Sequence, residues 1–154
     1  MRHYAPKMKT ITTHTKKIKH HLDNKCFADC NEEARDKILQ DLKKAKDLCY
    51  DLGEQVFQNQ GWNIPDELED LFYQLQEKGV IDSDLVDQMI AMYRLRQNLI
   101  IEKIEENDLA LVDEIIRQDL ADIDLYLREI KEYFITKDKI NPQRPEVEKE
   151  SLDN

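Results

Sequence analysis

The sequence has 154 residues, a formal net charge of -10, and only three glycines and four prolines. A chain of this length can bury a core of its own, and the scarcity of turn-forming residues favours an all-α fold over sheets. The acidic surface excludes general coating of nucleic acid, because phosphates are repelled at long range, although a local basic cleft could still hold RNA.

The first 25 residues depart from this acidic average, since they hold seven lysines and arginines against Asp23 alone. Residues 1–30 are therefore expected to form a basic N-terminal arm with a short first helix over 11–22. The arm is interpreted either as a solvated, partly disordered terminus or as a nucleic-acid contact.

Hydrophobic residues at helical spacing predict four more helices. These run from 32 to 59, from Pro65 to just before Gly79, from Asp82 or Ser83 to about Ile104, and from 108 to 136. The strongest apolar stripes are Ile38, Leu42, Ala45, Cys49, Leu52 and Val56 in the first of these, and Leu109, Val112, Ile116, Leu120, Ile123, Leu127, Ile130 and Phe134 in the last. Short links between helices indicate antiparallel neighbours. We expect an up-and-down bundle of four to five helices over 31–136 and a flexible tail over 137–154.

Local signals support the boundaries of these helices. Asn31 can cap the helix that starts at 32, and Gly61 can end it. Pro65 suits a first helical turn, and Gly79 ends that helix. The odd number of cysteines and the lack of a long apolar run predict a cytoplasmic protein that needs no membrane.

The distribution of histidine excludes many enzyme classes. All four histidines lie in the first 21 residues, so the predicted bundle contains no imidazole. The cluster of His20, His21, Cys26 and Cys30 does not match zinc-finger spacing, and the sequence predicts no metal and no cofactor. Cys49 is interpreted as a core residue.

Arg94 and Arg96 lie within a helix whose other inward positions are apolar, so each needs an acceptor or a solvent-filled cleft. One interpretation is ion pairing with acids of the last helix, such as Glu114 or Asp119. The other is a functional site.

The order of segments resembles the HepT-like branch of the HEPN superfamily over roughly residues 33–134. The matching elements are Asp51-Leu52-Gly53, Gly61 through Pro65, Leu75 through Asp82, Met92 through Lys103, and the long helix from Asp108. The resemblance implies a homodimeric, metal-independent ribonuclease of toxin–antitoxin type. It also implies a nucleotidyltransferase partner that silences the toxin by attaching AMP to a tyrosine.

The family motif is an arginine, four residues, a histidine, one residue and a tyrosine. Arg96 matches the arginine, but Ile101 stands at the histidine position and Lys103 at the tyrosine position. Glu102 keeps the intervening acid, and Asn98 replaces a frequent basic residue. In such a reaction the histidine would transfer protons and the arginine would stabilise phosphate, and isoleucine can do neither.

Three functions follow from these residues. The first is an inactive dimeric homologue that binds RNA through Arg94, Arg96, Asn98 and Lys103, or binds a protein. The second is an active ribonuclease that uses Arg96 with Lys103 or Glu102. The third is a helical adaptor whose arginines only form ion pairs. If the register is right, restoring histidine at 101 and tyrosine at 103 should recover cleavage.

Overall fold

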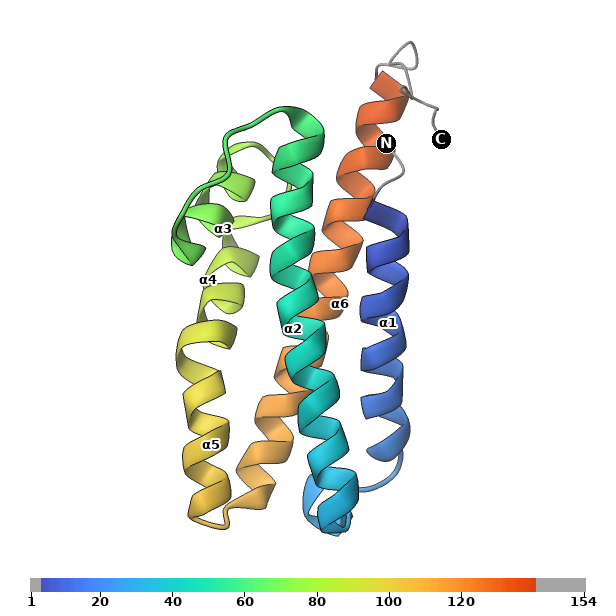
Figure 1. The fold of residues 1–154 in the computed structure, drawn as a ribbon, viewed down its shortest axis with the longest axis vertical. Coiled ribbons are helices and arrows are strands. Elements are labelled where there is room, and N and C mark those ends of the chain that lie inside the picture. The colour runs from blue at the N-terminus through green and yellow to red at the C-terminus, as the bar shows by residue number, and fades with distance from the viewer. Residues whose placement is uncertain (1–3, 141–154) are drawn as a thin grey trace.

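Helical segments run alternately up and down the molecule in the computed structural model, which describes residues 4–140 and the side chains of 4–137 (Figure 1). In chain order they are α1 (Tyr4–His21), the 3-10 turn η1 (Phe27–Asp29), α2 (Glu32–Gln60), α3 (Leu68–Glu77), α4 (Ser83–Ala91), the π-helical η2 (Met92–Arg96), α5 (Gln97–Glu105) and α6 (Leu109–Ile140). The segments α4, η2 and α5 together form one arm of the bundle, and α3 lies at one end. The predicted all-α, up-and-down bundle is confirmed.

The two strongest apolar stripes form the core as their spacing predicts. All six stripe residues of α2 are buried, and six of the eight stripe residues of α6 are buried, with Leu109 and Leu127 partly so. Asn31 caps α2 by accepting a hydrogen bond from the Ala34 backbone N–H at 2.8 Å. Gly61 ends α2 with a φ of 74°, in the left-handed region that glycine adopts without strain.

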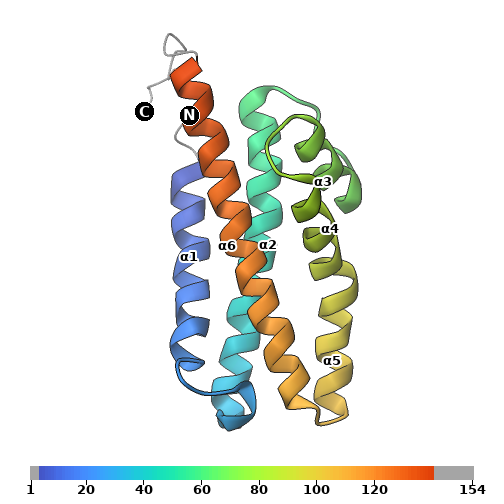
Figure 2. The ribbon, with the colours of Figure 1, turned by 180° about the vertical axis from the view of Figure 1, so that it is seen from behind.

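The first helix is longer than expected and belongs to the bundle. It begins at Tyr4, not at residue 11, and buries Ile11, Thr15 and Ile18. The lysines between these positions are exposed. Because they interrupt the few apolar residues, the helical pattern of this segment is weak in the sequence. The two views agree that α1 lies alongside α2 and α6 (Figure 2). Residues 1–3 of the predicted arm lie outside the described residues.

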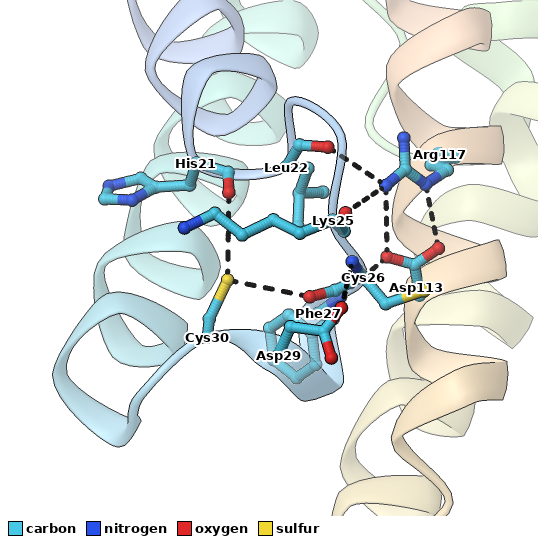
Figure 3. A network of polar contacts seen from close by, with 9 residues as sticks. All are labelled: His21, Leu22, Lys25, Cys26, Phe27, Asp29, Cys30, Asp113 and Arg117. Carbon is cyan, nitrogen blue, oxygen red and sulfur yellow. Dashed lines mark hydrogen bonds and ion pairs between the residues drawn. The ribbon is translucent and has the colours of Figure 1, made fainter.

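The link between α1 and α2 is fastened to α6 by polar contacts (Figure 3). Arg117 donates to the carbonyl oxygens of Leu22 at 3.3 Å and Lys25 at 2.8 Å, and it pairs with Asp113 at 2.8 Å. Asp113 in turn accepts from the Phe27 backbone N–H at 2.8 Å. These bonds satisfy backbone groups of an irregular segment, so the link holds a defined position against α6.

Helices α2, α3 and α6 approach closely at Gly53. A Cβ atom at this position would lie 2.8 Å from both a methyl of Leu71 and the hydroxyl of Tyr126. Tyr126 uses that hydroxyl to donate to the Cys49 carbonyl oxygen at 3.0 Å. The glycine of the Asp51-Leu52-Gly53 element is therefore needed for packing.

Several boundaries differ from the sequence expectation. α3 begins at Leu68 because Pro65 belongs to the preceding link and the extended Glu67 precedes the helix. α6 continues to Ile140, four residues into the predicted tail, and residues 141–154 of that tail lie outside the described residues. Over residues 4–140, no helix combines the length and the apolar character needed to cross a bilayer.

Candidate functional site

The positions that the resemblance assigns to the family motif lie on the arm formed by α4, η2 and α5. Helical spacing predicts Leu85, Met89, Met92, Leu99 and Ile100 on the inner side of this arm, and all are buried except Leu99, which is partly buried. Arg96 occupies the inward position between Met92 and Ile100 and is only 8% exposed. The π-helical segment that carries it is a rare backbone form that is frequent at functional sites.

Arg96 is held by acceptors from two elements. One guanidinium nitrogen, Nη2, lies 2.6 Å from Asp122 Oδ2 and donates to the Gln88 carbonyl oxygen at 2.7 Å. The Nε atom lies 3.3 Å from Asp119 Oδ1. The predicted pairing of an arginine with Asp119 is confirmed for Arg96, and its positive charge is directed into the bundle.

Lys46 of α2 completes this buried ion network, which we define as Lys46, Arg96, Asp119 and Asp122. Its ammonium lies 2.9 Å from Asp119 Oδ2, and its side chain is 4% exposed. Two cations and two carboxylates balance in charge. Burial raises the pKa of Asp119 above its ordinary value, because desolvation outweighs the attraction of Lys46 and Arg96.

Arg94 points away from this network and pairs on the surface. It donates from Nε and Nη2 to the two carboxylate oxygens of Glu69 on α3, at 2.8 and 3.0 Å. This two-point contact holds the pKa of Glu69 at about 2. The expected partners in the last helix are thus wrong for Arg94, because the side chain leaves the arm on the side of α3.

The other assigned positions lie on α5 and differ in exposure. Ile101 is 56% exposed, and Asn98 is exposed and donates to the Arg94 carbonyl oxygen at 3.0 Å. Lys103 lies 3.0 Å from Glu106 and 3.5 Å from Glu102. The hydrogen bond that the Lys103 ammonium donates to Glu106 raises the pKa of Lys103. Arg94 and Asn98 are therefore on the surface, Lys103 is partly buried with 21% of its side chain exposed, and Arg96 is buried.

The four potential soft ligands near the end of α1 do not converge. The Cys30 thiol donates to the carbonyl oxygens of His21 and Cys26, at 3.8 and 3.7 Å (Figure 3). No group of three metal-ligating side chains gathers anywhere within residues 4–137. All three cysteines carry free thiols.

Sequence reasoning missed Lys46 and Asp122, although a signal for them exists. Lys46 lies within the apolar stripe of α2, and Asp119 and Asp122 lie beside Ile116, Leu120 and Ile123 in α6. Charged residues at inward positions of facing helices are costly unless they pair. A search for opposite charges within the predicted stripes would have found the network.

Comparison with known proteins identifies the family to which this chain belongs. The family model described as ribonuclease HepT-like matches residues 8–130. This chain belongs to the HepT-like ribonuclease family. The match begins within α1, so the family domain includes this helix, which lies outside residues 33–134. No curated protein matches the sequence.

Solved structures share the fold of this HepT-like protein. A variant of the MntA–HpeT toxin–antitoxin has a TM-score of 0.69 and 24% identity, over 83% of this chain and 96% of that chain. A tri-AMPylated Shewanella oneidensis HEPN toxin in complex with an MNT antitoxin has a TM-score of 0.65 and 22% identity, with the same coverage. At this identity the likeness establishes the fold.

Proposed function

We propose that this HepT-like protein belongs to a toxin–antitoxin-type system, has lost RNA cleavage and acts by binding a protein partner. The observation that carries the proposal is the state of the motif. Ile101, at the position that the resemblance assigns to the histidine, lies on the surface of α5, while Arg96 is buried against Asp119 and Asp122. No proton-transfer group and no free guanidinium then face a common substrate.

The alternative of a cleaving enzyme with a substitute base is less well supported. Lys103 would need a lowered pKa to act as a base, and its hydrogen bonds to acids raise that pKa instead. Loss of a general acid or base removes a factor of about 10² to 10⁴ in rate. The wild-type chain is therefore expected to cleave RNA at least about 10²-fold more slowly than an active enzyme of this kind.

RNA binding at the motif surface also has little electrostatic support. Arg94 is neutralised by Glu69, and Lys103 is flanked by Glu102 and Glu106. Two apolar residues of the same arm are also exposed, Leu95 by 57% and Ile101 by 56%, in contrast with the buried apolar residues of the arm. Exposed apolar side chains on an arm whose surface charges are already paired suit a protein interface better than a phosphate strand.

Two protein partners fit this surface. A second copy of the chain would match the homodimer that the family resemblance implies. A nucleotidyltransferase of the antitoxin class would match the complex of the Shewanella oneidensis toxin. Lys103 offers no phenol for AMP, so such a partner would bind without modifying this position. The three free thiols fit a cytoplasmic setting, which is part of the proposal.

Cleavage is tested with purified full-length chain and labelled RNA in the presence of a chelator. The wild type is expected to leave the RNA intact. Ile101→His with Lys103→Tyr is expected to gain cleavage, because it supplies the missing proton-transfer group. Wild-type cleavage that is lost in Lys103→Met would overturn the proposal. An inactive but folded double variant would mean that the motif register is wrong or that the buried Arg96 cannot serve the added histidine.

The protein interface is tested by light scattering coupled to size exclusion. A dimer that weakens in Ile101→Asp supports an interface on α5. Ile135→Asp is the matched control, because Ile135 is 41% exposed at the far end of α6 and should leave the dimer unchanged. A wild-type monomer that also fails to bind a nucleotidyltransferase would favour the adaptor with purely structural arginines.

A further inference from the structure

A basic groove runs between α1 and α2, on elements that carry none of the family motif. Its volume is about 600 Å³. Both walls contribute cationic or titratable side chains, namely Lys16, Lys17, His20, His21, Lys37 and Lys44. On a protein with a net charge of -10, this concentration of positive charge is a local exception.

Most of the lysines in the groove are uncompensated. None of the ion pairs found among the described residues uses Lys16, Lys17 or Lys44. Lys37 has only a distant partner, since its ammonium lies 3.7 Å from Glu33. By contrast, Lys19 on the adjoining surface of α1 pairs with Asp124 of α6 at 2.7 Å. The positive charge in the groove is therefore available to a ligand.

The carboxylate in the groove is already occupied. Asp41 Oδ1 lies 2.8 Å from His14 Nδ1, and both side chains are mostly buried. The remaining polar group of the lining is the Gln40 amide, which can donate a hydrogen bond. An anionic ligand would thus meet ammonium, imidazole and amide donors and a single engaged acid.

The composition of the lining selects the kind of ligand. It contains no aliphatic anchor, and lysine is depleted in protein interfaces, whereas lysine ammonium groups are common contacts to phosphate. Lys37 and Lys44 are seven residues apart on α2, which is about 10 Å along the helix and enough to reach more than one phosphate. We propose that the α1–α2 groove binds the phosphate backbone of a nucleic-acid strand.

The overall acidity of the protein does not prevent this binding. At physiological ionic strength the screening length is about 8 Å, so a strand in the groove senses its lysines more than distant acids. The groove is also separate from the motif surface, because α1 and α5 lie at opposite edges of the bundle in both views (Figures 1 and 2). The inference therefore does not depend on whether the chain cleaves RNA.

The test measures fluorescence anisotropy of labelled single strands of about 16 nucleotides. RNA and DNA of the same sequence are titrated with the full chain between about 50 and 200 mM salt. Three to four phosphate contacts predict a loss in affinity of roughly 15- to 60-fold over this range. Lys16→Glu with Lys17→Glu should weaken binding about 10-fold or more and flatten the salt dependence.

A matched variant separates the groove from total charge. Lys43→Glu with Lys131→Glu makes the same change in net charge at exposed positions outside the groove, and should alter affinity less than about twofold. Circular dichroism checks that both variants are folded. Lys37→Glu with Lys44→Glu, on the facing wall, should repeat the loss of affinity.

The outcomes are distinct. Salt-sensitive binding of RNA, DNA or both that depends on the groove lysines supports the proposal, and the two strands show which nucleic acid is preferred. Equal weakening by groove and control variants, or no binding by the wild type, overturns it. Preferential binding of a poly-glutamate peptide over both strands also overturns it and indicates an acidic protein partner. Loss of binding would leave the cleavage test unaffected.

Discussion

Asp119 is the residue on which the buried ion network depends most. It is completely buried and lies between Lys46 at 2.9 Å and Arg96 at 3.3 Å. Asp119→Ala would leave two buried cations facing only Asp122. Removing one partner of a buried ion pair typically costs about 3–5 kcal/mol, a large part of the roughly 5–15 kcal/mol that stabilises a domain.

The assay is urea unfolding followed by far-UV circular dichroism, together with thermal melting. For a chain of this size, each kcal/mol lowers the melting temperature by about 2–4 °C, so the substitution should lower it by about 6–20 °C. Lys43→Met on the same helix is the control. Its partner Asp47 is exposed, and the free energy of unfolding should change by no more than about 0.5 kcal/mol.

A compensating variant tests the reasoning itself. Asp119→Leu with Lys46→Met removes one charge of each sign and leaves the pair of Arg96 and Asp122. Apolar replacement of a buried ion pair is often neutral or stabilising, so the double variant should be more stable than Asp119→Ala. Two results would refute the account of a coupled network. One is a loss of stability below about 1 kcal/mol for Asp119→Ala, and the other is a loss in the double variant equal to the sum of the losses in Asp119→Leu and Lys46→Met alone.

Three further predictions concern packing, thiol chemistry and surface charge. Gly53→Ala should destabilise the fold by about 1–2 kcal/mol in urea unfolding, because overpacking against α3 and α6 outweighs the gain in helix propensity. A stabilised variant would contradict the close approach of the three helices at Gly53. A thiol reagent should label Cys26 rapidly in the native protein and Cys49 only on unfolding, because Cys49 is buried and burial raises the pKa of its thiol. Rapid labelling that persists in Cys26→Ser would contradict this expectation. Arg94 holds the pKa of Glu69 at about 2, so the contact should contribute fully to stability above pH 4.5, and that contribution should be lost as the pH falls through about 2. NMR titration should show a higher pKa for Glu69 in Arg94→Ala, and an unchanged pKa would exclude Arg94 as the cause.

Local sequence determined most of the helices. The stripes of α2 and α6, the cap at Asn31 and the stop at Gly61 depend on residues within a few positions of one another, because helix periodicity and capping are local properties. The replacements assigned to Ile101 and Lys103 follow from counting along the chain from Arg96, and they stay a prediction of the resemblance. Even so, the weak stripe of α1 concealed a full member of the bundle.

Only the tertiary structure decided which charges are available. Arg96 and Arg94 are two residues apart, yet the first is buried against α6 and the second pairs with α3. Their partners lie far away in the sequence, and an ion pair forms only where folding brings opposite charges together and removes water. The same holds for the basic groove, because its lysines come from two antiparallel helices that meet only when α1 packs on α2.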